Sequence, residues 1–162
     1  MLSKAMAEAL NRQVNREFFS SYLYLAMSAY FENENLQGFA HWMKVQAKEE
    51  NLHAMKIYEH IVARGGRAEL AAIEAPKAKW ASAGKVFEEA LAHEQKVTGM
   101  INTIVELSTA EKDHASFEML QWFVREQVEE EKQVFDVLAQ IRMVGDTPGH
   151  LIYLDRHVGK RE

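Results

Sequence analysis

The chain has 162 residues, of which 48% are hydrophobic and 27% are charged, and its formal net charge at pH 7 is −5. This length predicts one domain, and the acidic balance argues against a nucleic-acid partner. The absence of cysteine excludes a disulfide framework, a zinc-thiolate site and a thiol nucleophile. No apolar run approaches the roughly 20 residues that span a bilayer, and the first residues do not form a signal peptide. We therefore expect a cytoplasmic protein with no membrane partner.

Long helices are predicted because glycine and proline are sparse along the chain. The predicted helices cover, in chain order, residues 3–32, 36–64, 83–110 and 113–143, and a short fifth helix follows Pro148. Ser3, Ser82 and Asp113 stand where helix N-caps are expected. Gly65 and Gly145 follow the second and fourth helices, as helix-ending glycines do.

The connection over residues 65–82 determines the predicted topology. Extended, it reaches roughly 60 Å, whereas a helix of the predicted length is about 43 Å long. It can therefore cross the whole molecule and make the second and third helices parallel, while short turns make the other neighbouring pairs antiparallel. The fold class is all-α: a four-helix bundle with one long crossover and a short C-terminal fifth helix. We expect a single domain over residues 1–162, with the bundle in 1–145 and the C-terminal helix and tail in 146–162.

Each long predicted helix carries an apolar stripe that a glutamate interrupts near its middle. These four residues are Glu17, Glu50, Glu94 and Glu130. A single glutamate on one stripe would be interpreted as a tolerated polar side chain. Here the same interruption occurs on all four helices, so that interpretation is not sufficient. A buried carboxylate requires a compensating partner, and none of the 19 lysines and arginines lies on the stripes. The pattern therefore predicts a metal as the compensating partner.

The spacing of the neighbouring residues supports a dinuclear site. His53 follows Glu50 by three positions, and Gln127 precedes Glu130 by three, so each pair shares one helix face. Four carboxylates balance two divalent ions. Oxygen ligands with one imidazole suit iron or manganese, and zinc can also bind. Tyr24 lies two turns from Glu17 on the same face, where it either hydrogen-bonds to a ligand or donates an electron, or is a core tyrosine with a satisfied hydroxyl.

Two other interpretations fit the same acidic core. A di-iron or di-manganese redox enzyme would act on an organic substrate or a peroxide, and it would need a substrate pocket beside the metals. A metal-free helical interaction module would keep its buried acids protonated. The first alternative can be tested by the mass of the protein in solution, because such an enzyme does not need to form a large shell. The second can be tested by measuring whether the protein binds metal.

The chain resembles the non-haem ferritins of bacteria and archaea. The segments that carry the resemblance are 17–24, 38–43, 49–54, 64–67 and 126–131. The resemblance implies ferroxidase activity, in which dioxygen (O2) or hydrogen peroxide (H2O2) oxidises Fe(II), and storage of Fe(III) as a mineral in a hollow 24-subunit shell. It also implies two irons per subunit. Glu17, Glu50 and His53 would bind the first iron. Glu50, Glu94 and Glu130 would bind the second, with Glu50 bridging and Gln127 orienting water or oxygen nearby.

Two departures separate the chain from related families and predict that it binds no haem. Bacterioferritins have a histidine where this chain has Glu130, and a haem-binding methionine where it has Asn51. Rubrerythrins usually add a cysteine-ligated iron domain, which a sequence without cysteine cannot build. A redox enzyme of the rubrerythrin or bacterioferritin type remains the alternative.

A third iron position is expected beside the pair, formed by Glu49, Glu126 and Glu129. Each precedes a residue of the stripe by one and therefore points about 100° away around its helix. Because the second and fourth helices are expected to be antiparallel, a step of one residue back along each rotates the side chains in opposite senses. The three glutamates therefore point to the same side of the interface between these two helices. Separately, we expect the apolar residues of the C-terminal segment, Leu151, Ile152, Leu154 and Val158, to pack against other subunits.

Overall fold

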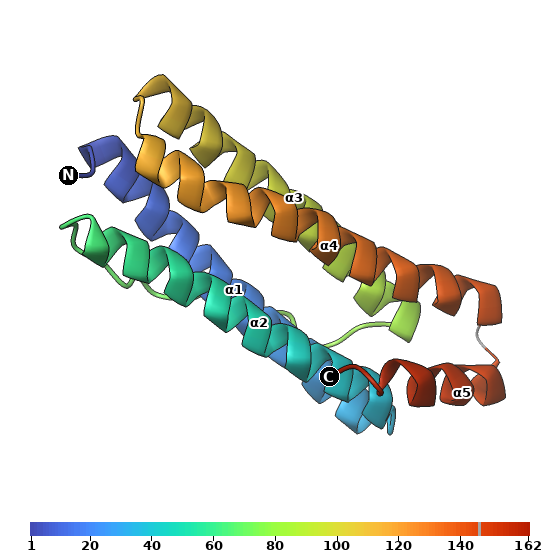
Figure 1. Ribbon diagram of the computed structural model, residues 1–162. Coiled ribbons are helices and arrows are strands. Elements are labelled where there is room, and N and C mark those ends of the chain that lie inside the picture. Colours follow the sequence, from blue (N-terminus) through green and yellow to red (C-terminus); the bar gives the residue numbers. More distant parts are fainter. Residues whose placement is uncertain (146) are drawn as a thin grey trace.

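The computed structural model describes residues 1–145 and 147–162, and this part of the chain forms five helices (Figure 1). They are α1 (Lys4–Asn33), α2 (Gln37–Ala63), α3 (Ala83–Ala110), α4 (His114–Val144) and α5 (Pro148–Val158). The all-α prediction is confirmed. The predicted start of the C-terminal segment at residue 146 lies outside the described residues. None of the described helices combines the length and apolar character needed to cross a lipid bilayer.

Three predicted caps set the helix starts. The Ser3 hydroxyl accepts a hydrogen bond from the Met6 backbone N–H at the start of α1. Ser82 caps α3 in the same way, and the Asp113 carboxylate caps α4. Each cap satisfies a backbone donor that has no partner within its helix. The four long helices begin and end within one residue of the predicted positions.

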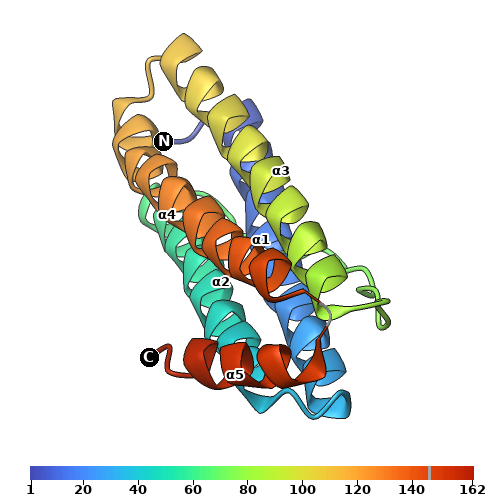
Figure 2. The same cartoon turned by 90° about the vertical axis from the view of Figure 1, so that its right-hand side faces the viewer.

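The topology is the predicted one. Figure 1 shows α1 and α2 as one antiparallel pair lying beside a second antiparallel pair, α3 and α4. The connection between α2 and α3 runs the length of the bundle, so these two helices are parallel (Figures 1 and 2). The four long helices have similar lengths, from 27 to 31 residues, and lie side by side, so their middle turns lie at about the same level along the bundle axis.

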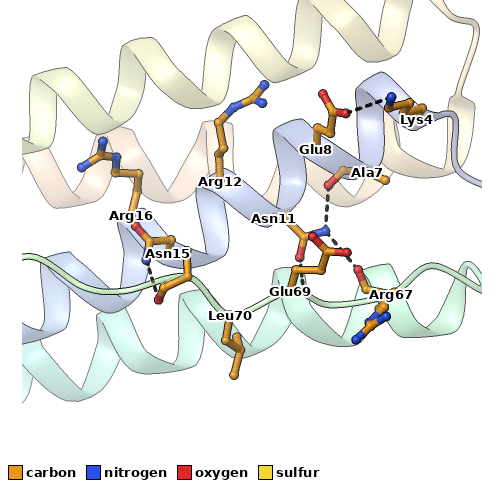
Figure 3. A pocket seen from close by; sticks show the side chains of 11 residues that line it. Lys4, Ala7, Glu8, Asn11, Arg12, Asn15, Arg16, Arg67, Glu69 and Leu70 are labelled. Atoms are coloured by element: carbon orange, nitrogen blue, oxygen red, sulfur yellow. Dashed lines mark hydrogen bonds and ion pairs between the residues drawn. The ribbon is translucent and has the colours of Figure 1, made fainter.

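Side chains of α1 hold the crossover against the bundle, as Figure 3 shows for its first part. The Asn11 side chain accepts from the Glu69 N–H at 2.7 Å and donates to the Arg67 carbonyl at 3.0 Å. Asn15 donates to the carbonyl of Ala72 at 3.1 Å. A surface pocket of about 690 Å³ lies here between α1 and residues 67–71, and no residue of the buried acidic layer lines it.

The core consists of two apolar clusters separated by a polar layer. One cluster surrounds Phe31, Phe39 and Phe87, and the other surrounds Ile57 and Phe123. Each long helix contributes buried polar residues to the layer between them, and these include Glu17, Gln46, Glu50, Glu94, Gln127 and Glu130. Burial of apolar surface above and below stabilises the bundle and so allows the polar layer to exist.

Helix α5 lies across one end of the bundle against α2 (Figure 2). The first turn of α2 has no local side-chain cap, and the Asp155 carboxylate of α5 instead accepts from the Phe39 N–H at 2.8 Å. Leu154 and Val158 are buried in the core of their own chain. The expectation that these two residues pack against other subunits was therefore wrong, because the core of their own chain already covers them. Ile152 remains 49% exposed.

A methyl group at Gly38 is predicted to displace α5, because a Cβ there would lie 1.7 Å from the Asp155 carbonyl oxygen. In Gly38→Ala we expect the bundle to fold, with melting about 5 °C or more lower because the α2 cap and the burial of two apolar side chains are lost. Hydrogen exchange should accelerate in α5. Gly99→Ala is the matched control: Gly99 also lies in a helix, has no atom within 4 Å of the added Cβ, and should gain slightly in stability. Unchanged exchange in α5 of Gly38→Ala would contradict this docking.

Candidate metal centre

The middle of each long helix contributes one glutamate to the polar layer. Glu17, Glu50, Glu94 and Glu130 are each only 1% exposed. His53, one turn after Glu50 on α2, is also buried. Within residues 1–145 and 147–162, no lysine or arginine forms an ion pair with any of these four carboxylates.

The side chains form two groups that could each hold one metal ion. Ligand atoms of Glu17, Glu50 and His53 all lie within 4.8 Å of one another. Those of Glu50, Glu94 and Glu130 do the same. Glu50 belongs to both groups, so its two carboxylate oxygens can serve two ions at once.

Buried polar atoms without partners show that a cation fits the first group. Among the described residues, neither Glu17 Oε2 nor His53 Nδ1 has a hydrogen-bond partner, although both are buried. His53 Nδ1 lies 3.4 Å from Glu50 Oε2. Buried polar atoms normally have partners, so these two unpartnered atoms are available as ligands for a cation.

In the metal-free protein, burial makes the charged form of these carboxylates unfavourable and raises their pKa values. Burial, with repulsion from Glu50, raises the pKa of Glu17 to about 8. Burial also raises the pKa of Glu94 to about 7 and that of Glu130 to about 7. The pKa of Glu50 is raised well above its ordinary value by burial and by the charges of Glu94 and Glu130. These carboxylates hold protons that a cation would displace.

Amide side chains donate to the carboxylates and fix their orientation. Gln127, which the sequence predicted beside the site, donates to Glu94 Oε2 at 3.2 Å. Sequence reasoning missed two others. Gln13 donates to Glu17 Oε1 at 2.7 Å, and Gln46 donates to both Glu50 and Glu130. Each precedes a glutamate by four positions on its own helix, and this i, i+4 spacing was the available signal.

Tyr24 donates a hydrogen bond to Glu94 on the neighbouring helix α3. The sequence placed it near Glu17, and the structure shows that its partner is the glutamate of α3. Burial and the nearby Glu94 raise the pKa of Tyr24 well above its ordinary value, so the hydroxyl remains protonated and donates.

The three residues of the predicted third position lie in different surroundings. Glu126 forms a group with His53 and Glu130, with ligand atoms within 4.8 Å of one another. Glu49 instead forms an ion pair with Arg161 near the C-terminus, at 2.5 Å. Glu129 is exposed to solvent.

The stability of the metal-free protein should fall as pH rises from about 5 to about 8. The folded carboxyls have raised pKa values, so the folded state binds more protons than the unfolded state in this range, and the free energy of unfolding decreases with pH. We expect a drop in melting temperature of about 5–10 °C, measured by calorimetry. Glu17→Gln should flatten this slope, whereas Glu8→Gln, at an exposed position on the same helix, should not. A slope equal in all three proteins would contradict the raised pKa of Glu17.

Comparison with known proteins gives matches over nearly the whole chain. The family model for the ferritin-like domain matches residues 7–144. The chain is 40% identical to a bacterial non-heme ferritin of Bacteroides fragilis over 161 residues, which cover 99% of this chain and 100% of the relative. It is also 40% identical to a bacterial non-heme ferritin of Staphylococcus aureus, covering 99% of this chain and 97% of the relative.

Comparison with solved structures also gives matches to ferritins over the whole chain. An open pore ferritin from the archaeon Archaeoglobus fulgidus superimposes with a TM-score of 0.98 and 44% identity, covering 100% of both chains. A humanized archaeal ferritin gives a TM-score of 0.98 and 43% identity, covering 100% of this chain and 99% of the other.

Proposed function

This chain belongs to the ferritin family, and we propose that the acidic layer in its bundle is the centre at which it oxidises Fe(II). Iron storage with iron oxidation is the function that the family supports. The observation that carries the assignment of the site is the pair of ligand groups that share Glu50. A redox enzyme acting on an organic substrate is less favoured, because the described pockets near the surface are not lined by these carboxylates.

The first iron position consists of Glu17, Glu50 and His53. The Nδ1 atom of His53 is the ligand atom, since it faces Glu50 and lacks another partner. The other ring nitrogen, Nε2, lies 3.9 Å from Glu130 Oε1. When Nδ1 of the neutral imidazole binds the ion, the ring proton is on Nε2, which faces the carboxylates of Glu130 and Glu126.

The second iron position consists of Glu50, Glu94 and Glu130. Gln127 and Tyr24 both donate to Glu94, and so hold this carboxylate in place before iron arrives. Gln127 is also close enough to the same position to orient water or oxygen there. Tyr24 can also donate one electron when the oxidation is incomplete.

The oxidation balances at this pair of positions. Two Fe(II) ions each give one electron, and dioxygen takes both electrons with two protons to form hydrogen peroxide. Hydrogen peroxide can oxidise a further pair of Fe(II) ions. Two Fe(III) carry six positive charges against four carboxylates, and this excess is balanced when bound water loses protons. A centre with a single histidine then releases its product to the mineral.

A third iron position lies at the edge of the pair, next to Glu126. Its group with His53 and Glu130 supports this proposal. Glu49 and Glu129 complete the position when Glu49 is released from Arg161. With three acids at the surface of the layer, iron binds there more weakly than at the buried pair, and the position serves as a temporary stop for iron.

We propose further that the chain is one domain and that 24 copies assemble into a hollow shell. Exposed apolar side chains on the long helices support assembly; they include Tyr22, Leu25, Val62 and Phe135. Native mass spectrometry should give a particle of about 450 kDa, from 24 chains of 18.6 kDa. A monomer or dimer of full oxidation activity would favour the redox enzyme instead.

Glu50→Ala should damage rapid iron oxidation more than any other single change, because it removes a ligand from both positions. We expect the initial rate to fall by at least about 100-fold, an effect on the order of 3 kcal/mol, in stopped-flow absorbance. The melting temperature of the metal-free protein should stay level or rise, because one buried carboxylate is gone. Glu59→Ala, at an exposed position on the same helix, should leave the rate unchanged. Normal oxidation with a large loss of stability in Glu50→Ala would contradict the assignment.

A further inference from the structure

Gln46 holds two of the proposed iron ligands together. Its side chain is fully buried on α2, one turn before Glu50. The amide nitrogen Nε2 donates to Glu50 Oε1 at 3.1 Å and also to Glu130 Oε2 on α4. The amide oxygen Oε1 is buried and has no partner among the described residues. One NH2 group thus lies between two carboxylates, as a cation would.

The oxygens that Gln46 leaves free face His53. Glu50 Oε2 is 3.4 Å from His53 Nδ1, and Glu130 Oε1 is 3.9 Å from His53 Nε2. Glu50 can therefore serve the first position through Oε2 while Gln46 remains in place. To bridge to the second position, Glu50 must use Oε1, and this oxygen is the one bonded to Gln46.

We propose that the Gln46 amide is a placeholder for the second iron, so that the two positions fill in a fixed order. This inference rests on the proposed function of the site. The first ion binds at Glu17, Glu50 and His53 without disturbing Gln46. The second ion must displace the Gln46 NH2 group from Glu50 Oε1, the oxygen that Glu50 needs for bridging, and it therefore binds more weakly. Gln46 is a positioning residue that acts through these two ligands.

Gln13 provides a natural contrast. It is also a buried glutamine, and it also donates to a carboxylate four residues along its helix. Its acceptor is Glu17 Oε1, whereas Glu17 Oε2 is free. A terminal ligand needs only one oxygen for metal, so Gln13 orients Glu17 without competing for its metal-binding oxygen.

The test is titration of the intact metal-free protein with Co(II), followed by calorimetry and visible absorbance at pH 8, where protons compete less. The wild type should show two resolved steps. In Gln46→Met, which keeps the side-chain length and removes the donor, the dissociation constant of the second step should fall about tenfold, or about 1.4 kcal/mol. The two steps should then merge. Gln133→Met, the same substitution at an exposed position on α4, should leave the second step unchanged within about twofold.

A second step in Gln46→Met that is unchanged or weaker would overturn the proposal. A crystal of the Co(II)-loaded wild type gives a check that does not depend on how well the variant folds: Gln46 Nε2 should have moved out of hydrogen-bond reach of Glu50 Oε1, and an intact hydrogen bond would also overturn it. A different result is expected if the acidic layer is not the metal-binding centre at all. In that case Glu50→Gln would bind Co(II) as the wild type does.

Discussion

Burial of four carboxylates at one level of a helical bundle is the constraint on which the rest of this structure depends. Their pKa values are raised because the surrounding helices exclude water, with Glu17 reaching about 8. In the described part of the chain, no basic side chain forms an ion pair with these four carboxylates. Arg161 instead pairs with Glu49, at the edge of the acidic layer. Long helices with apolar clusters on both sides of the layer supply the stability that this arrangement costs.

The polar layer is ordered by neutral donors. Gln13, Gln46, Gln127 and Tyr24 all donate to the glutamates, so each carboxylate has at least one fixed oxygen before a cation arrives. Neutral donors fix geometry without cancelling the charge that binds metal. A lysine in any of these places would satisfy the carboxylates permanently, whereas an amide can be displaced. The same layer can thus fold without metal and still leave carboxylate oxygens available to a cation.

Features that depend on local sequence could be predicted, and features that depend on contacts between distant residues could not. Ser3, Ser82 and Asp113 identify helix starts because capping acts within one turn, and periodicity places one glutamate on each stripe. The cap of α2 was missed, because Asp155 lies 116 residues from Phe39. The partner of Tyr24 was also missed, since it depends on how α1 faces α3. The role of Gln46 was missed as well, because its bond to Glu130 depends on the packing of α4.

Anomalous X-ray scattering at the iron edge, from crystals soaked anaerobically with Fe(II), tests the account most directly. The acidic layer should show two peaks in each chain. One should lie among Glu17, Glu50 and His53, and the other among Glu50, Glu94 and Glu130, with one oxygen of Glu50 directed at each. An empty layer with iron bound only at surface acids would contradict the claim that the buried carboxylates exist to bind iron.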